Sequence, residues 1–123
     1  MGIGSFFRAL LGQVVHESAP GERVAVAMVD DVVIARTDVY KKVEGNVYFP
    51  PESVDRSFVH DSSQTTVCHW KGLAMYYDLA VPGRQLKDCA WYYPNPSDAA
   101  AGIRDHVAFD RRVTVREMAA TSD

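Results

Sequence analysis

Residues 73–94 read LAMYYDLAVPGRQLKDCAWYYP, and this stretch decides the fold class of the chain. From its first residue to Val81, larger apolar side chains recur at every second position, which is the period of a β-strand. Pro82-Gly83 then predicts a turn, and the residues after it predict a second strand that returns along the first. The stretch therefore predicts an antiparallel hairpin at the centre of a mainly β fold.

The register of this hairpin depends on its loop. If Pro82-Gly83 alone forms the loop, Leu79 lies opposite Leu86 and Tyr76 lies opposite Cys89. Pro-Gly favours a type II turn, whose twist suits two-residue hairpins poorly, so a bulge or a longer loop would shift these pairs. The pattern leaves both registers open.

The flanking segments predict further short strands and little helix. A β-branched run over residues 24–37 is broken at Asp30-Asp31, which predicts a tight hairpin. Other expected elements are strands at 43–48, 107–109 and 113–116, a short turn or helix at 51–54, and a short helix at 97–104 capped by Asn95-Pro96. The sequence thus predicts one mainly β domain over residues 23–118, with one or two short helices.

Both chain ends are expected to lie outside this domain. Apolar residues recur at helical spacing from Ser5 to Val15, so residues 1–22 are interpreted as an N-terminal extension that forms a short amphipathic helix or is disordered. Residues 119–123 are expected to form a frayed tail.

Composition excludes several classes of protein. The 123 residues suit one domain, and 47% hydrophobic with 24% charged residues is ordinary for a globular chain. A net charge of -3 offers no basic excess for nucleic acid. No membrane span and no secretory signal are evident. With two cysteines, Cys68 and Cys89, the chain is expected to be a cytoplasmic bacterial-type protein with free thiols.

Aromatic residues gather around the central hairpin. Residues 65–72 read TTVCHWKG and residues 88–94 read DCAWYYP. Together with Tyr76-Tyr77, these segments resemble the signature of the bacterial domain of unknown function 427 family, which runs T-x-C-x-[WY]-K-G, paired tyrosines, then A-W-x-Y-P. The resemblance covers nearly everything after Arg23. It implies a compact β-tent-like arrangement of small antiparallel sheets, and it implies no activity.

Two positions depart from the family pattern. His69 stands where the family usually has proline, and Asp31 stands where it usually has glycine. Because proline restricts the backbone, the histidine is expected to alter the geometry beside Cys68. No phosphate-binding glycine loop or paired acidic metal motif accompanies the signature.

The aromatic segments predict a site for a small molecule. Tyrosine and tryptophan offer flat apolar walls with polar edges, and such residues line ligand pockets. In this hypothesis Lys71 supplies a positive end, and Asp88 tethers Lys71 or a ligand donor. The alternative is core packing, with a solvated Lys71 and a surface Asp88. The expected ligand-binding residues are Trp70, Lys71, Tyr76, Asp88, Trp91 and Tyr93.

Cys68 and Lys71 are the candidate reactive groups. On an extended strand, Cys68 would share a face with Trp70, whereas His69 would share the opposite face with Lys71 and could not act as the base for the thiol. The commoner role of a lone cysteine is that of a small buried hydrophobe. The histidines are scattered singly and no C-x-x-C pair occurs, so no metal site and no cofactor are predicted.

Three functions are compatible with these residues. The leading hypothesis is a domain that binds a small molecule in an aromatic-lined pocket with Lys71 at one end. The alternatives are a small enzyme that uses the same cleft, with Cys68 or Lys71 reacting, and a protein–protein adaptor. Replacing Lys71 by alanine is expected to leave the fold intact and to remove ligand affinity.

Overall fold

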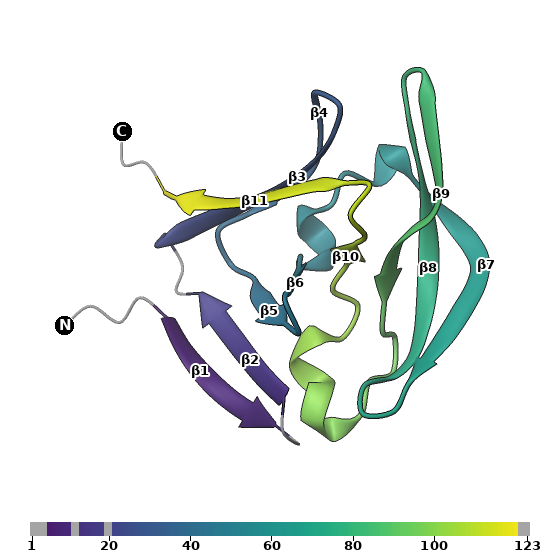
Figure 1. Ribbon diagram of the computed structural model, residues 1–123. Helices are drawn as coiled ribbons and strands as arrows, with labels where there is room; N and C mark the ends of the chain where they lie inside the picture. Colours follow the sequence, from purple (N-terminus) through teal and green to yellow (C-terminus); the bar gives the residue numbers. More distant parts are fainter. Residues whose placement is uncertain (1–4, 11–12, 19–20, 121–123) are drawn as a thin grey trace.

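The protein is built from short strands in three antiparallel sheets (Figure 1). The computed structural model describes residues 5–10, 13–18 and 21–120, with side chains from residue 21 onward. The strands are β1 (Ser5–Leu10), β2 (Gln13–Ser18), β3 (Arg23–Val29), β4 (Val32–Thr37), β5 (Lys41–Val43), β6 (Asn46–Tyr48), β7 (Val59–Cys68), β8 (Gly72–Val81), β9 (Arg84–Tyr92), β10 (Ala108–Phe109) and β11 (Thr114–Ala119). The helical turns of the described residues are 3-10 segments: η1 (Pro51–Ser53), η2 (Arg56–Phe58) and η3 (Asp98–Ile103).

The strand orders are β1-β2-β5-β6, β10-β9-β8-β7 and β11-β3-β4. In Figure 1 the long strands β7, β8 and β9 stand on one side of the molecule, and the three-stranded sheet lies across the top. Strands β5 and β6 lie near the centre of this view, below the three-stranded sheet. Phe49 and Val107 exchange two backbone hydrogen bonds of 2.8 Å that join the middle of the molecule to the approach to β10. The predicted mainly β fold of small antiparallel sheets is confirmed.

The loop of the central hairpin contains the two predicted residues. Val81 pairs with Arg84 across Pro82-Gly83, and Leu79 pairs with Leu86. Gly83 has a φ of 79°, which a residue with a side chain rarely adopts. At the tip of the hairpin, the first of the two open alternatives, a loop of Pro82-Gly83 alone, is therefore the one found, because glycine supplies the required backbone conformation.

The open end of the same hairpin has a different register from the first alternative. Tyr76 lies opposite Trp91 and not opposite Cys89. A bulge in β9 causes the shift: Asp88 adopts a φ of 54°, and its backbone N–H donates to Asp78 Oδ1 at 2.7 Å. A side-chain acceptor on the partner strand thus satisfies the backbone donor at the bulge, a contact that strand periodicity does not reveal.

The strand expected over residues 43–48 is a hairpin. Val43 pairs with Asn46, and the turn between β5 and β6 consists of Glu44 at φ 54° and Gly45 at φ 82°. Two successive residues with positive φ are typical of a type I′ turn, which matches the twist of the strands it joins. The prediction of one strand was wrong because it passed over this turn.

The helix expected over residues 97–104 is a kinked 3-10 segment, η3. It does not begin at Asn95-Pro96, and Ser97 at its N-cap makes no side-chain capping bond. Instead Ser97 Oγ donates to the carbonyl oxygen of Trp70 at 2.5 Å. The Ser97 hydroxyl therefore binds the loop between β7 and β8 and does not cap η3.

The sequence left an amphipathic helix and disorder as alternatives for residues 1–22; in the described part of this segment, residues 5–10 and 13–18 form the hairpin β1–β2 and no helix. Val15, His16 and Glu17 of β2 pair with β5, whose edge would otherwise lack a partner. A helix of about a dozen residues is marginal in water, whereas sheet pairing satisfies the backbone at once. The remaining residues of the predicted extension lie partly outside the described ranges.

The hairpin over residues 24–37 is confirmed as β3 and β4, with Val29 paired to Val32 and Asp30 at φ 54°. The short segment η1 matches the turn or helix expected at 51–54. The last two predicted strands exist, but β10 pairs with β9 and β11 pairs with β3. Ala119 pairs with Arg23, so the frayed tail does not begin at residue 119.

Two clusters of buried side chains form the core. The first lies where the three-stranded sheet faces β8 and β9, and its largest fully buried members include Val29, Ile34, Phe49, Leu79 and Val107. The second lies beneath the loop between β7 and β8, and it contains Val43, Tyr48, Ala74, Tyr93, Ala100, Ile103 and Ala108. The aromatic signature packs against this second cluster. Among the described residues, no helix is long and apolar enough to cross a membrane.

Candidate functional site

The loop between β7 and β8 carries the first half of the signature. Strand β7 ends at Cys68, and β8 begins at Gly72, whose φ is 114°. A β-carbon on Gly72 would lie 3.4 Å from the backbone oxygen of Asn95. The segment before η3 also binds the loop, because Ser97 N–H donates to the Lys71 carbonyl oxygen at 3.0 Å. The loop is therefore held by backbone contacts from a distant segment.

Lys71 is buried in this loop and is only 4% exposed. Its ammonium forms a salt bridge with Glu44, from the turn between β5 and β6. The same Nζ lies 4.8 Å from the centre of the Trp70 ring and 5.6 Å from that of Tyr93. Burial lowers the pKa of the ammonium, but Glu44 and Cys68 raise it above its ordinary value. Lys71 thus carries a full charge at neutral pH, and that charge is already compensated.

Cys68 is the partly exposed thiol beside this cation. Burial raises the pKa of Cys68, but hydrogen bonds from the backbone N–H groups of Lys71 and Trp70, together with the ammonium of Lys71, lower it below its ordinary value. These donors stabilise a thiolate. The expected separation of Cys68 from Lys71 on opposite strand faces is wrong, because the strand ends at Cys68 and the chain turns.

His69 is exposed on this turn. The groups that act on the Cys68 pKa are those of Trp70 and Lys71. The strand alternation from which His69 was expected to face away from Cys68 does not apply, because β7 ends at Cys68 and the chain turns there.

Three partly exposed aromatic side chains, Trp70, Tyr76 and Trp91, pack against the second core cluster, as Cys68 does, and they are called the aromatic wall below. The ring centres of Tyr76 and Trp91 are 6.3 Å apart. Each polar edge has a partner: Trp70 Nε1 donates to Glu44 at 3.1 Å, Trp91 Nε1 donates to Tyr48 at 3.2 Å, and the Tyr76 hydroxyl bonds that of Thr66 at 3.0 Å. These bonds fix the orientation of the wall.

Tyr93 lies behind the wall as part of the second core cluster, with 5% of its surface exposed. Burial raises its pKa. Tyr77 and Tyr92 point to the opposite face of the sheet, where their rings stack at 4.5 Å between centres. The aromatic signature therefore has three parts: the aromatic wall, the buried Tyr93 behind it, and the stacked pair Tyr77 and Tyr92 on the opposite face of the sheet.

Asp88 makes its hydrogen bonds with residues other than Lys71. Its carboxylate accepts a hydrogen bond from the Ser62 hydroxyl of β7, and its backbone N–H is bound by Asp78. The salt-bridge partner of Lys71 is Glu44. Of the predicted site residues, the structure brings together Cys68, Trp70, Lys71, Tyr76, Trp91 and Tyr93, whereas Asp88 belongs to the bulge of β9.

Glu44 and Tyr48 were missed by the sequence analysis. Both come from the hairpin β5–β6, and Glu44 adopts a positive φ in its turn. The dipeptide Glu44-Gly45 could have predicted this turn, because glycine in a two-residue loop is typical of a β-hairpin. The charged residue before the glycine would then lie at the tip of the hairpin.

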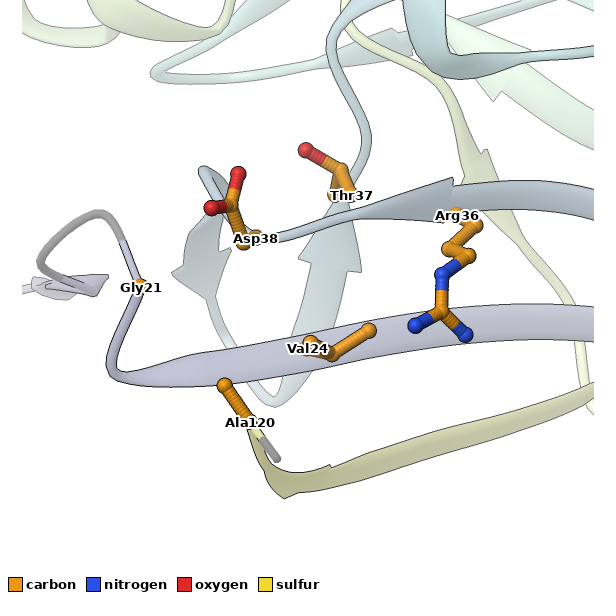
Figure 2. Close-up of a pocket in the computed structure, with 6 residues that line it drawn as sticks. All are labelled: Gly21, Val24, Arg36, Thr37, Asp38 and Ala120. Carbon is orange, nitrogen blue, oxygen red and sulfur yellow. The ribbon is translucent and has the colours of Figure 1, made fainter. Parts of the chain in front are cut away.

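Two hollows lined by described residues lie away from the aromatic wall. One of about 530 Å³ is lined by Gly21, Val24, Arg36, Thr37, Asp38 and Ala120 (Figure 2). A smaller one of about 240 Å³ lies between β8 and β9 near Asp78 and Lys87. Within the described residues, no three His, Cys, Asp or Glu side chains gather in a way that could hold a metal ion.

The fold and the wall together define a small mainly β domain with an aromatic signature around one loop. The family described as Domain of unknown function (DUF427) matches residues 17–120, so the chain belongs to this family. The match begins inside β2, which places part of the predicted N-terminal extension within the family's own span. No curated protein matches the sequence.

Proposed function

We propose that this domain binds a small, flat molecule against the wall of Trp70, Tyr76 and Trp91. The observation that carries the proposal is that three aromatic rings, from β8, β9 and the loop between β7 and β8, stay partly exposed, although their polar edges are held by internal hydrogen bonds. A pre-oriented aromatic surface binds a planar partner with little loss of side-chain freedom.

The polar end of such a site is the pair Lys71–Glu44 and not a free ammonium. Because Lys71 is buried and neutralised, the more accessible group is the carboxylate of Glu44, whose side chain is 34% exposed. A ligand that donates a hydrogen bond to this carboxylate fits the wall better than an anion does. The expected positive end is thereby replaced by a compensated pair.

The test is native mass spectrometry of protein purified from its own host, compared with a denatured sample. We expect a bound mass that disappears on denaturation and that is reduced by Tyr76→Leu. The matched control is Tyr77→Leu, at the neighbouring position on the opposite face, which should retain the bound mass. An empty wild-type protein, or equal loss in both variants, would contradict the proposal.

A second candidate function, a thiol-dependent enzyme at the same wall, is favoured by Cys68. Its thiol is partly exposed, and backbone N–H groups with Lys71 lower its pKa. A thiolate so placed can attack an electrophilic carbon of a molecule held on Trp70. The raised pKa of Lys71 argues against its amine as the nucleophile, because a protonated amine has no free electron pair.

Alkylation by iodoacetamide tests this candidate. The Cys68 thiolate forms a carbon–sulfur bond as iodide leaves with the electron pair of the carbon–iodine bond. We expect Cys68 to react at a lower pH than an ordinary thiol, because its pKa is lowered. Cys89 should stay unmodified in the folded protein because it is buried and its pKa is raised to about 11. Peptide mass spectrometry across pH distinguishes the two thiols. Equal rates, or a Cys68 rate unchanged by Lys71→Met, would rule the candidate out.

A further inference from the structure

The outer face of the three-stranded sheet presents two arginines across one valine. Ala25, Ala27 and Val29 of β3 belong to the first core cluster, so Val24, Val26 and Met28 point outward by strand alternation. Arg36 of β4 and Arg116 of β11 are both register partners of Val26. Directly opposed residues share a face, so the two arginines flank the same outward side chain.

Both arginines are exposed, whereas Val26 between them is only 6% exposed. Their aliphatic stems therefore cover Val26, which leaves the two guanidinium groups at the surface. Within residues 21–120, neither guanidinium forms a salt bridge or a hydrogen bond. The nearest carboxylate along the chain, that of Asp38, points away from Arg36 (Figure 2).

A hollow of about 530 Å³ opens beside Arg36 on this face. Figure 2 shows the Arg36 side chain reaching from β4 over β3, with Val24 on β3 and Ala120 just after the end of β11. Its size lies within the range of small-molecule sites. Arg36 gives the hollow a cationic side, Val24 and Ala120 give it an apolar part, and the carboxylate of Asp38 lines another side.

We propose that this face binds a phosphate monoester that carries a small apolar group, with the phosphate between Arg36 and Arg116 and the apolar group on Val24. Strand spacing puts the two arginine backbones about 10 Å apart, a span that two long side chains can close around one anion. A phosphate dianion offers three oxygens to two guanidinium forks, and arginine recognises such oxygens in bidentate fashion. The net charge of -3 disfavours a polyanion such as nucleic acid.

This site is separate from the aromatic wall, which lies on another sheet. A failure of one proposal would therefore not affect the other. The probe is phenyl phosphate, titrated into ¹⁵N-labelled protein and followed by NMR. We expect saturable shifts of the Arg36 and Arg116 Nε–H signals and of the backbone amides of Val24 and Val26. Inorganic phosphate should shift the arginine signals more weakly, and phenol should shift neither.

Arginine variants distinguish binding at this site from nonspecific attraction of the anion to positive charge. Arg36→Gln and Arg116→Gln keep methylenes over Val26 and should each weaken phenyl phosphate binding by about tenfold or more, as the loss of one charge-assisted contact requires. The matched control, Arg111→Gln, removes the same charge from an exposed arginine outside this sheet and should leave affinity unchanged. No saturable shift in the wild-type protein, or an equal loss in the Arg111→Gln control, would overturn the proposal.

Discussion

At the scale of single residues, Lys71 shows how burial changes the role of a charge. From the sequence, a lysine next to a tryptophan was predicted to be a surface cation that binds a ligand. In the structure Lys71 is only 4% exposed and forms a salt bridge with Glu44. Its charge also acts on Cys68, whose pKa it helps to lower. The side chain therefore holds the loop and tunes the thiol.

Replacing Lys71 should then affect stability, contrary to the expectation that an alanine variant would fold unchanged. We expect Lys71→Ala to lower the free energy of unfolding by roughly 2–3 kcal/mol, because it leaves a cavity and removes the partner of Glu44. Lys71→Met, which fills the same space, should cost less than half of that.

Urea unfolding of both variants measures the difference. The control pair is Lys87→Ala and Lys87→Met, since the Lys87 side chain is 78% exposed and its pairing with Asp78 spans 3.7 Å. Similar losses at Lys71 and Lys87 would show that Lys71 does not act as a buried side chain.

At the scale of elements, the loop from Cys68 to Gly72 determines the site. It brings the thiol, the cation and an aromatic ring together because the chain reverses within three residues. Gly72 permits this at a φ of 114°, and Ser97 holds the loop through its backbone and side chain. A strand that continued past Cys68 would have separated these groups.

We expect Gly72→Ala to destabilise the protein by roughly 1–3 kcal/mol, because a β-carbon strains the positive φ and approaches the Asn95 carbonyl oxygen. The shift of the loop should also slow Cys68 alkylation at neutral pH. Thermal unfolding and alkylation rates check both effects.

Gly102→Ala is the comparison for this substitution. Gly102 lacks a positive φ, and its added carbon would meet only the flexible end of the Lys41 side chain. An equal loss of unfolding free energy in Gly102→Ala and Gly72→Ala would contradict the proposed role of Gly72 in the loop.

At the scale of the whole molecule, the fold holds several weak acids in their neutral forms. Burial raises the pKa of Cys89 to about 11 and that of Tyr92 to about 12, and it raises the pKa of Tyr93 as well. A group whose pKa is higher in the folded state stabilises the fold fully below its unfolded pKa, and this contribution is lost as pH rises through the folded pKa.

The free energy of unfolding should therefore fall as pH rises from about 9, the ordinary value for cysteine, towards 12. Urea titrations at successive pH values measure this slope. Tyr92→Phe removes one titrating group and should flatten the slope above pH 10. An unchanged slope in this variant would mean that the phenol does not contribute.

Much of the secondary structure could be predicted from local sequence patterns. Alternation predicted β8 and β9, and Asp30-Asp31 predicted the turn of the first domain hairpin, because side-chain direction and turn preferences are properties of a few consecutive residues. The same local reasoning failed at the N-terminus, where helical spacing was overridden by the pairing of β2 with β5. It also passed over the tight turn at Glu44-Gly45.

By itself the sequence determined the family, the mainly β class and the residues of the aromatic signature, because these depend on composition, period and motif. The tertiary structure alone decided that Glu44 neutralises Lys71, that Asp88 belongs to a bulge, and that Arg36 and Arg116 flank Val26. Each of these contacts joins residues brought together by a reversal, a bulge or a strand pairing. Their energies depend on burial and distance in space, which no local pattern contains.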